Sequence, residues 1–334
     1  MSSASQLNDK QLEAMKYVQG PLLVLAGAGS GKTSVITRKI AYLVQHCGMP
    51  AYRITAMTFT NKAAREMKER VTKLLSREEA KGLSVSTFHN FGLNLLRLEL
   101  KNLPLKANFS ILDADDCKRI LMDLMQRDNL SGAESKELIA KAMRKISEWK
   151  NDLVLPEHVH SICETQEDVQ LAHLYQLYER NLRAYNAVDF DDLIVMPTRL
   201  LQENAEVRDK WQNRVRYLLV DEYQDTNTAQ YTLVKLLVGV MGQFSAVGDD
   251  DQSIYAWRGA KPENMALLKD DFHNLKVIKL EQNYRSTSRI LKAANAVIEN
   301  NPHIFDKKLW SDKGHGDSIR VITCLNDDDE AERV

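Results

Sequence analysis

Short apolar runs recur along this chain, and each is followed by polar or glycine-rich residues. Between several of these runs, apolar residues recur at helical spacing. Strands that alternate with helices predict an α/β fold, in which helices flank a parallel sheet. The runs of strand length are at 21–26, 54–59, 83–88, 217–220, 244–247 and 277–280. The helical faces expected after the first two runs consist of Ile36, Ile40, Leu43, Val44 and Cys47, and of Ala63, Ala64, Met67, Val71 and Leu74.

Helix boundaries are also indicated at two places. The first helix is expected to stop at Gly48, because glycine followed by a nearby proline is a common stop signal. A later helix is expected to begin near Asn90, after the run at 83–88.

A long interval from about Leu93 to Arg216 contains no strand pattern, only apolar residues at helical spacing. A loop of that length would be unusual, so the interval predicts a mostly helical domain inserted into the sheet. Three acids in it, Asp189, Asp191 and Asp192, could suggest a metal site. We interpret them instead as a helix cap with an acidic first turn, because an apolar run follows Asp189.

The first apolar run leads into a glycine-rich stretch that ends in Lys32 and Thr33. A strand that enters such a turn and opens a helix directs backbone N–H groups at one point, which suits a phosphate chain. This is the P-loop pattern, with an alanine at the usual first glycine. Lys32 would reach the β and γ phosphate oxygens, and the Thr33 hydroxyl would hold Mg²⁺. The residues predicted to bind nucleotide here are Ala26, Gly27, Ala28, Gly29, Ser30, Gly31, Lys32, Thr33 and Ser34.

The run at 217–220 is followed at once by Asp221 and Glu222. In a nucleotide hydrolase, one acid at the end of such a strand holds Mg²⁺, and the next orients and deprotonates the attacking water. We assign these roles to Asp221 and Glu222 in that order. An ordinary acidic loop is the alternative, and the upstream P-loop argues against it.

The run at 244–247 continues into GDDDQSIYAWRG. In this segment Gln252 could hydrogen-bond a γ-phosphate or its water. Tyr255 and Trp257 offer stacking faces, and Arg258 offers a cation, which together fit a nucleic-acid strand. The alternative is that both aromatic residues belong to the core.

Further DNA contacts are predicted where two strands end. Phe59 and Asn61 follow one strand, and Thr87 and His89 follow another. Ligands of α/β sheets bind at this edge, and an aromatic ring beside polar donors fits a single strand. His89 could equally be a core or capping residue.

Gln11 lies just upstream of the P-loop strand. Its amide can donate and accept at once, which matches the N6 and N7 edge of adenine. A surface glutamine is the alternative interpretation.

The bulk composition limits the class of protein. The chain has 334 residues with 45 Lys+Arg and 46 Asp+Glu, so a nucleic-acid site must be a local patch. Its 4 cysteines are scattered, which indicates a reducing compartment and neither disulfides nor a zinc site. The sequence shows no signal pattern and no membrane-spanning run, so we expect a soluble, cytoplasmic protein without a membrane partner.

Several segments, taken in order, closely resemble the motifs of the UvrD/Rep/PcrA family of superfamily 1 DNA helicases. The resemblance covers the whole chain. The segments are LNDKQ, AGAGSGKT, TFTNKAAREMKERV, STFHNFG, LLVDEYQDTNTAQY, VGDDDQSIYAWRGA and LEQNYRS.

The resemblance implies a RecA-like P-loop fold and an ATP-driven motor that moves 3′ to 5′ on single-stranded DNA, with ATP and Mg²⁺ as cofactors. It implies that Gln11 reads adenine, that Tyr284 stacks on it and that Arg285 is an arginine finger. The catalytic set would then be Lys32, Glu222, Gln252 and Arg285. Family members commonly have arginine where this chain has Ser34, so base stacking would rest on Tyr284 alone.

The resemblance also implies a division into domains. We expect a first motor domain at 1–92 and 214–278, a helical insertion at 93–213, and the start of a second motor domain at 279–334. Later family motifs do not follow, so we expect the amino-terminal half of a helicase, unable to unwind DNA alone.

Expected partners are single-stranded DNA and 3′-tailed or forked duplexes, with replisome or restart proteins as candidates. We expect a monomer or weak homodimer. Two other classes remain open: a P-loop enzyme with a small-molecule substrate, and a binding module without catalysis. The aromatic pair beside Gln252 argues against the first.

Overall fold

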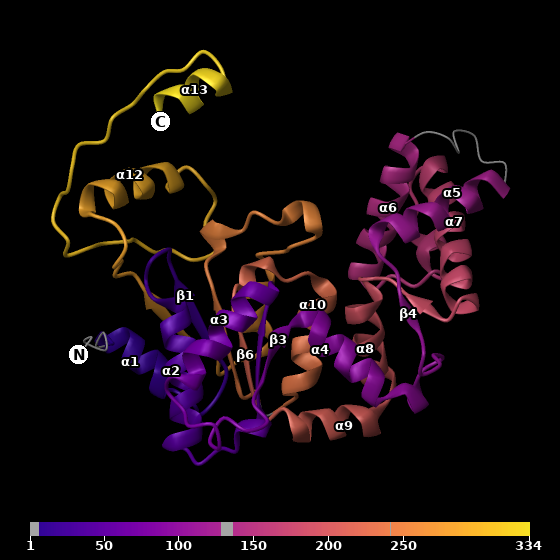
Figure 1. Cartoon of the computed structure of the whole chain (residues 1–334), viewed down its shortest axis with the longest axis horizontal. Helices are drawn as coiled ribbons and strands as arrows, with labels where there is room; N and C mark the ends of the chain where they lie inside the picture. Colours follow the sequence, from indigo (N-terminus) through magenta and orange to yellow (C-terminus); the bar gives the residue numbers. More distant parts are fainter. Residues whose placement is uncertain (1–6, 128–135, 241) are drawn as a thin grey trace.

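The computed structural model describes residues 7–127, 136–240 and 242–334. A six-stranded parallel sheet organises the larger part of it, with strand order β3-β2-β6-β7-β1-β8. The predicted α/β fold with a parallel sheet is therefore confirmed (Figure 1). Its strands are β1 Leu22–Ala26, β2 Ile54–Thr58, β3 Ser84–Thr87, β6 Tyr217–Val220, β7 Phe244–Gly248 and β8 Lys276–Leu280.

Helices cover both faces of this sheet, so its central strands β1, β2, β6 and β7 are buried along their whole length. Burial on both faces explains why they read as continuous apolar runs without alternation. The helices of the described residues are α1 Asp9–Lys16, α2 Lys32–Gln45, α3 Asn61–Thr72, α4 Phe88–Leu98, α5 Ala114–Arg127, α6 Lys136–Asn151, α7 Gln166–Ala184, α8 Asp192–Glu203, α9 Ala205–Arg214, α10 Thr228–Val238, α11 Asn264–Asp271, α12 Ser288–Ile298 and α13 Asp327–Arg333.

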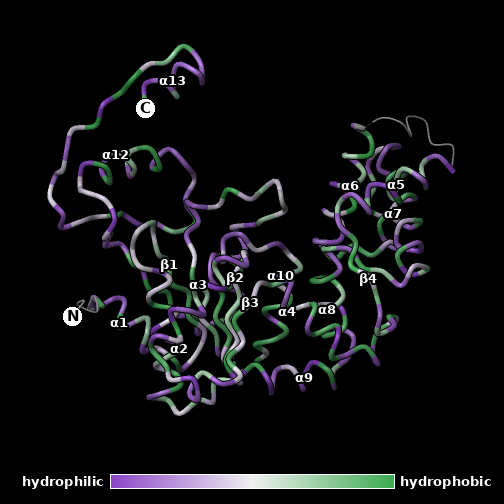
Figure 2. Tube along the Cα trace, in the orientation of Figure 1, coloured by the Kyte–Doolittle hydropathy of each residue, from purple (hydrophilic) through white to green (hydrophobic). Residues whose placement is uncertain are grey.

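Two separate apolar clusters fill the two sides of the sheet. One contains residues of α1, α2 and α3, and the other contains residues of α4, α8, α9, α10 and α11. Figure 2 shows hydrophobic residues along the strands in the middle of this part of the molecule. The nucleotide motifs are thus carried by a rigid, well-buried scaffold.

Three details of the predicted helices were wrong. Helix α2 ends at Gln45, so Cys47 lies past the helix and is exposed. Helix α3 ends at Thr72, so Leu74 no longer follows the helical face and is exposed, while Leu75 is buried instead. Helix α4 begins at Phe88, before the predicted start at Asn90, because the Thr87 side chain caps it.

The inserted helices α5, α6 and α7 pack around a core of their own, away from the sheet (Figure 1). The interval is mostly helical, as predicted, but it also contains two short strands that the sequence did not signal. Strands β4 Ser110–Ile111 and β5 Ala187–Val188 pair in parallel there. Strands this short leave no periodic pattern in the sequence.

Helices α8 and α9 lie within the predicted insertion at 93–213, but their apolar residues belong to the sheet cluster that also contains residues of α4, α10 and α11. Ile194, Leu201 and Trp211 all belong to that cluster. The predicted domain boundaries remain a prediction, and we propose that the insertion ends near β5.

At the start of α8, Asp189 and the first helical residue, Asp192, bond each other reciprocally, whereas Asp191, directly before the helix, makes no side-chain capping bond. The Asp192 N–H donates to the Asp189 carboxylate at 2.9 Å, and the Asp189 N–H donates back at 3.1 Å. The sequence did not predict their partner, the buried ammonium of Lys150, which lies 2.8 Å from each carboxylate and 2.7 Å from Glu179. Burial lowers the pKa of Lys150, but these acids raise it well above its ordinary value. A lysine thus neutralises the cluster that could have suggested a metal.

Polar contacts at the end of α6 join the insertion to α10. The Asn227 amide donates to the Asn151 side chain at 2.7 Å, and the Thr228 hydroxyl donates to Asp152 at 2.8 Å. Lys261 pairs with the same Asp152 carboxylate at 2.5 Å.

Among the described residues, no helix is both long and apolar enough to cross a membrane.

Candidate nucleotide site

The P-loop forms a tight turn between β1 and α2. Gly29 and Gly31 have positive φ values of 71° and 87°, which glycine adopts without strain. Gly31 precedes the first helical residue and supplies no side-chain cap. The Ser34 and Val35 N–H groups donate to the Gly31 carbonyl, so the N–H groups that point out of the helix end are those of Lys32 and Thr33. Such N–H groups at a helix end form the anion-binding geometry that the sequence predicted.

The carbonyl groups of the P-loop are held from two directions. Gln11 donates to the Ser30 carbonyl at 2.8 Å. The Asn283 amide donates to the Ala28 carbonyl at 2.5 Å, and the Tyr284 N–H donates to Gly29 at 2.9 Å. The loop is therefore fixed between the segment before β1 and the segment after β8.

Gln11 and Tyr284 both lie beside the loop. The side-chain amide oxygen of Gln11 accepts from the Asn8 backbone N–H at 3.0 Å in a capping box of α1. Asn8 also donates to the Tyr284 hydroxyl at 2.8 Å, so the two predicted adenine contacts share one neighbour. Gln11 keeps a second amide hydrogen and a second lone pair for a base. Adenine recognition remains a prediction.

A buried lysine, which the sequence did not single out, anchors the helix that carries Gln11. The Lys39 ammonium donates to the Ala14 carbonyl at 3.0 Å and also to the Tyr17 carbonyl. Burial lowers the pKa of Lys39 to about 7. These bonds fix the carboxyl end of α1 on α2, and thereby the position of Gln11.

Three predicted catalytic side chains meet at the carboxyl ends of the strands. The Lys32 ammonium lies 3.2 Å from the Glu222 carboxylate and 3.4 Å from the Gln252 amide oxygen. They come from α2, from the turn after β6 and from the turn after β7. A phosphate oxygen that bound Lys32 would replace or share these contacts.

Asp221 is buried at the end of β6 and accepts from the Glu222 N–H at 3.1 Å. Burial and the adjacent Glu222 carboxylate raise the pKa of Asp221 to about 6, although Lys32 opposes the shift. A carboxylate whose charge is disfavoured in this way gains from a bound cation. A carboxylate and the Thr33 hydroxyl are hard oxygen ligands, so these residues fit Mg²⁺.

Glu222 adopts a left-handed conformation with φ 52°, which costs a residue other than glycine about 1–3 kcal/mol. Its side chain is held by Lys32 and by the Gln224 amide at 3.0 Å. Gln224 also accepts from the Asp249 N–H at 3.0 Å and so links the turns after β6 and β7. Sequence analysis missed Gln224, although it lies two residues after Glu222.

The predicted DNA contacts occupy different environments. The half-buried Phe59 ring lies 5.3 Å from that of Phe88, and the Asn61 side chain accepts from Asn90 at 3.0 Å. Thr87 is buried, and its hydroxyl caps α4. The part-buried His89 ring lies 6.1 Å from the ring of Phe190, and burial lowers the pKa of His89.

The aromatic pair after β7 is different. The Trp257 side chain is 71% exposed, which argues against the alternative that it is a core residue. Its ring centroid lies 6.4 Å from that of Tyr255. The Arg258 side chain lies outside the described part of the structure. All of these DNA contacts remain predictions.

Comparison with known proteins decides the family. Residues 7–273 match the UvrD/REP helicase N-terminal domain, and residues 278–334 match the UvrD-like helicase C-terminal domain. The chain belongs to the UvrD/REP helicase family. The resemblance found in the sequence is thereby confirmed, and the P-loop geometry described above is that of a UvrD/REP helicase N-terminal domain.

Individual members of the UvrD/REP helicase family align along nearly the whole chain. The ATP-dependent DNA helicase Rep of Escherichia coli (strain K12) is 56% identical over 98% of this chain and 48% of its own length. Rep of Salmonella typhimurium is 55% identical over the same shares. The ATP-dependent DNA helicase PcrA of Staphylococcus aureus (strain Mu50) is 43% identical over 99% of this chain and 45% of its own length. The chain spans about half the length of the curated relatives it matches.

Proposed function

We propose that this chain is the nucleotide-binding part of an ATP-dependent DNA helicase or translocase that moves 3′ to 5′ along single-stranded DNA. The observation that carries the proposal is the convergence of Lys32, Glu222 and Gln252 at the P-loop of a UvrD/REP family chain. A phosphate-binding lysine, a base and a γ-phosphate contact are the parts that nucleotide hydrolysis requires. The proposed substrates are ATP and single-stranded or 3′-tailed duplex DNA.

In this proposal the backbone N–H groups of the P-loop and Lys32 bind the phosphates, and Thr33 with Asp221 would hold Mg²⁺. When bound, Mg²⁺ neutralises charge on the phosphate oxygens. Glu222 accepts a proton from the attacking water, and Lys32 and Gln224 hold its carboxylate in place. Gln252 donates to the γ-phosphate or its water, and Arg285 stabilises the charge that develops there.

The test is phosphate release by the complete gene product that carries this chain, with and without single-stranded DNA. We expect ATP hydrolysis that the DNA stimulates and that unwinds a 3′-tailed duplex. Hydrolysis that DNA does not change would instead favour a P-loop ATPase with another substrate. Binding of ATP and DNA without any hydrolysis would favour a binding module.

Replacing Trp257 with alanine should weaken binding to single-stranded DNA by roughly 1–3 kcal/mol, the usual contribution of one stacked base. The ring is exposed beside Tyr255 and close to Gln252 in the chain, so it can stack on a base without unfolding the core. Fluorescence titration against an oligonucleotide at several salt concentrations measures the effect.

The salt dependence should change little, because it reports neutralised phosphates and not stacking. Tyr185, which is 60% exposed on the insertion, is a matched aromatic control, and Tyr185→Ala should retain the affinity. If Trp257→Ala bound DNA normally but melted at a lower temperature, the ring would have a structural role.

A further inference from the structure

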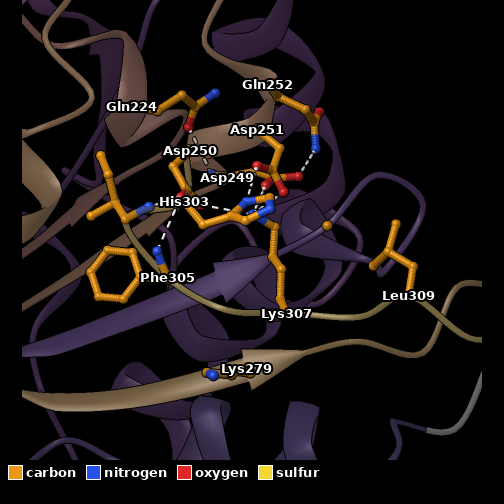
Figure 3. Close-up of polar contacts among 12 residues, drawn as sticks. Gln224, Asp249, Asp250, Asp251, Gln252, Lys279, His303, Phe305, Lys307 and Leu309 are labelled. Carbon is orange, nitrogen blue, oxygen red and sulfur yellow. Dashed lines mark hydrogen bonds and ion pairs between the residues drawn. The ribbon is translucent and has the colours of Figure 1, made fainter. Parts of the chain in front are cut away.

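Residues 303–307, which follow α12, lie against the turn that follows β7. That turn contains three consecutive acids, Asp249, Asp250 and Asp251, which we call the acidic triplet. The Lys307 ammonium lies 2.7 Å from a carboxylate oxygen of Asp249, 2.7 Å from one of Asp250 and 2.5 Å from one of Asp251 (Figure 3). The Lys307 side chain is only 4% exposed, so the ion pairs are largely shielded from water.

The rest of the segment is anchored to the same place. The N–H groups of Ile304 and Phe305 both donate to the Asp250 carboxylate at 3.2 Å. The His303 ring nitrogen lies 3.3 Å from Asp251, and Phe305 is buried in the sheet cluster that contains residues of α4, α8, α9, α10 and α11. This segment belongs to the residues that match the UvrD-like helicase C-terminal domain, whereas the triplet belongs to the N-terminal match.

The number of charges explains why a lysine suits this position. Three carboxylates this close would repel one another without a cation. The Lys307 ammonium forms an ion pair with each of them and donates a hydrogen bond to Asp250. Burial lowers the pKa of Lys307, but the three acids raise it well above its ordinary value. Lys307 therefore stays charged and fills the space that a metal ion would need among the acids.

The triplet is linked directly to the catalytic side chains. The other carboxylate oxygen of Asp249 accepts from the Gln252 amide, whose oxygen faces Lys32 at 3.4 Å. The Asp249 N–H donates to Gln224, which in turn holds Glu222. A shift of Asp249 would therefore move the two side chains that face the phosphate and the water.

We propose that Lys307 is a positioning residue for ATP hydrolysis: it fixes Asp249 so that Gln252 points into the nucleotide site. The site is then assembled correctly only while the 303–307 segment is docked on the triplet. This inference rests on the proposed ATPase function. The alternative is that Lys307 only fastens the segment, with no effect on the chemistry.

The test replaces Lys307 with methionine, which keeps the length of the side chain and removes its charge, in the complete gene product. At saturating MgATP, the rate of phosphate release should fall on the order of tenfold, as when a group that orients a catalytic residue is lost. The affinity for MgADP, measured by titration, should stay within about twofold, because the proposed contact of Gln252 is with the γ-phosphate or its water, which MgADP lacks. The matched control is Lys308→Met, an exposed neighbour with the same charge, which should keep the normal rate.

A double variant separates positioning from fastening. If Lys307 acts through Gln252, adding Lys307→Met to Gln252→Ala should slow the single-turnover rate by less than about twofold further. If the Lys307→Met protein does not fold, Lys307→Arg keeps the charge but displaces Asp249, and it should also slow hydrolysis at unchanged MgADP affinity. A normal rate in the folded variant, or the same loss with and without Gln252, would overturn the inference. A wild-type protein that never hydrolyses ATP would contradict the proposed function instead.

Discussion

Replacing Glu222 with glutamine should lower ATP hydrolysis by about three orders of magnitude, within the range expected for the loss of a general base. Binding of MgATP should remain, because glutamine keeps the size of the side chain and an acceptor for Lys32 and Gln224. Lys32→Ala should abolish hydrolysis and also weaken binding, since it removes a direct phosphate contact. Nucleotide titration and single-turnover phosphate release measure the two properties separately.

The comparison between the two variants is the informative part. Loss of MgATP binding in Glu222→Gln would refute the division of roles, because the carboxylate would then be needed to build the site. The strained φ of Glu222 makes a folding control necessary, and thermal melting supplies it. Glutamine has the same backbone preference as glutamate, so the strained φ should not change the melting temperature of the variant.

Replacing Arg285 with alanine should slow hydrolysis by about 10³-fold or more, the usual effect of losing an arginine finger. The Arg285 side chain starts directly beside the P-loop, since a Cβ placed on Gly29 would lie 2.8 Å from the Arg285 Cβ. The side chain of Asn283 accepts from the Arg285 N–H at 2.8 Å and fixes its backbone. Arg285→Lys should not restore the rate, because an ammonium lacks the planar fork of donors.

The control for Arg285 is Arg289, which lies in the first turn of α12. Arg289 donates to Ser318 at 2.8 Å, so Arg289→Ala makes the same charge change away from the loop. Phosphate release at saturating ATP, with MgATP affinity measured alongside, distinguishes a transition-state contact from a binding contact. If Arg285→Ala hydrolysed ATP within tenfold of the normal rate, Arg285 would not be the arginine finger, and another cation would have to stabilise the transition state.

The predicted strands were found because each is an apolar run bounded by polar residues. Lys32, Glu222 and Gln252 were each predicted from the residues that follow such a run. Their side chains lie together because the carboxyl ends of parallel strands meet at one edge of the sheet. Boundaries were less accurate, as at α4, which begins at Phe88 and not near Asn90 because the Thr87 hydroxyl caps it.

The contacts that the sequence did not predict join residues that are far apart in the chain. Lys307 and Asp250 are separated by 57 positions, and Lys150 lies far from Asp189 and Asp192 in the same way. Helical or strand periodicity says which face of an element is apolar, but it does not say which charge meets which. For the same reason, α8 and α9 were predicted to belong to the insertion, although their apolar faces pack against the sheet with α4, α10 and α11.

The short pairing of β4 with β5 means that the insertion leaves and re-enters the scaffold at neighbouring points. The Leu112 N–H donates to the Val188 carbonyl at 2.9 Å, and the Ser110 N–H donates to Asn186 at 3.1 Å. Because the two ends of the insertion are paired, their separation does not depend on the length of the chain between them. The architecture therefore lets the size of this module vary while β4 and β5 keep its two ends at one place on the scaffold.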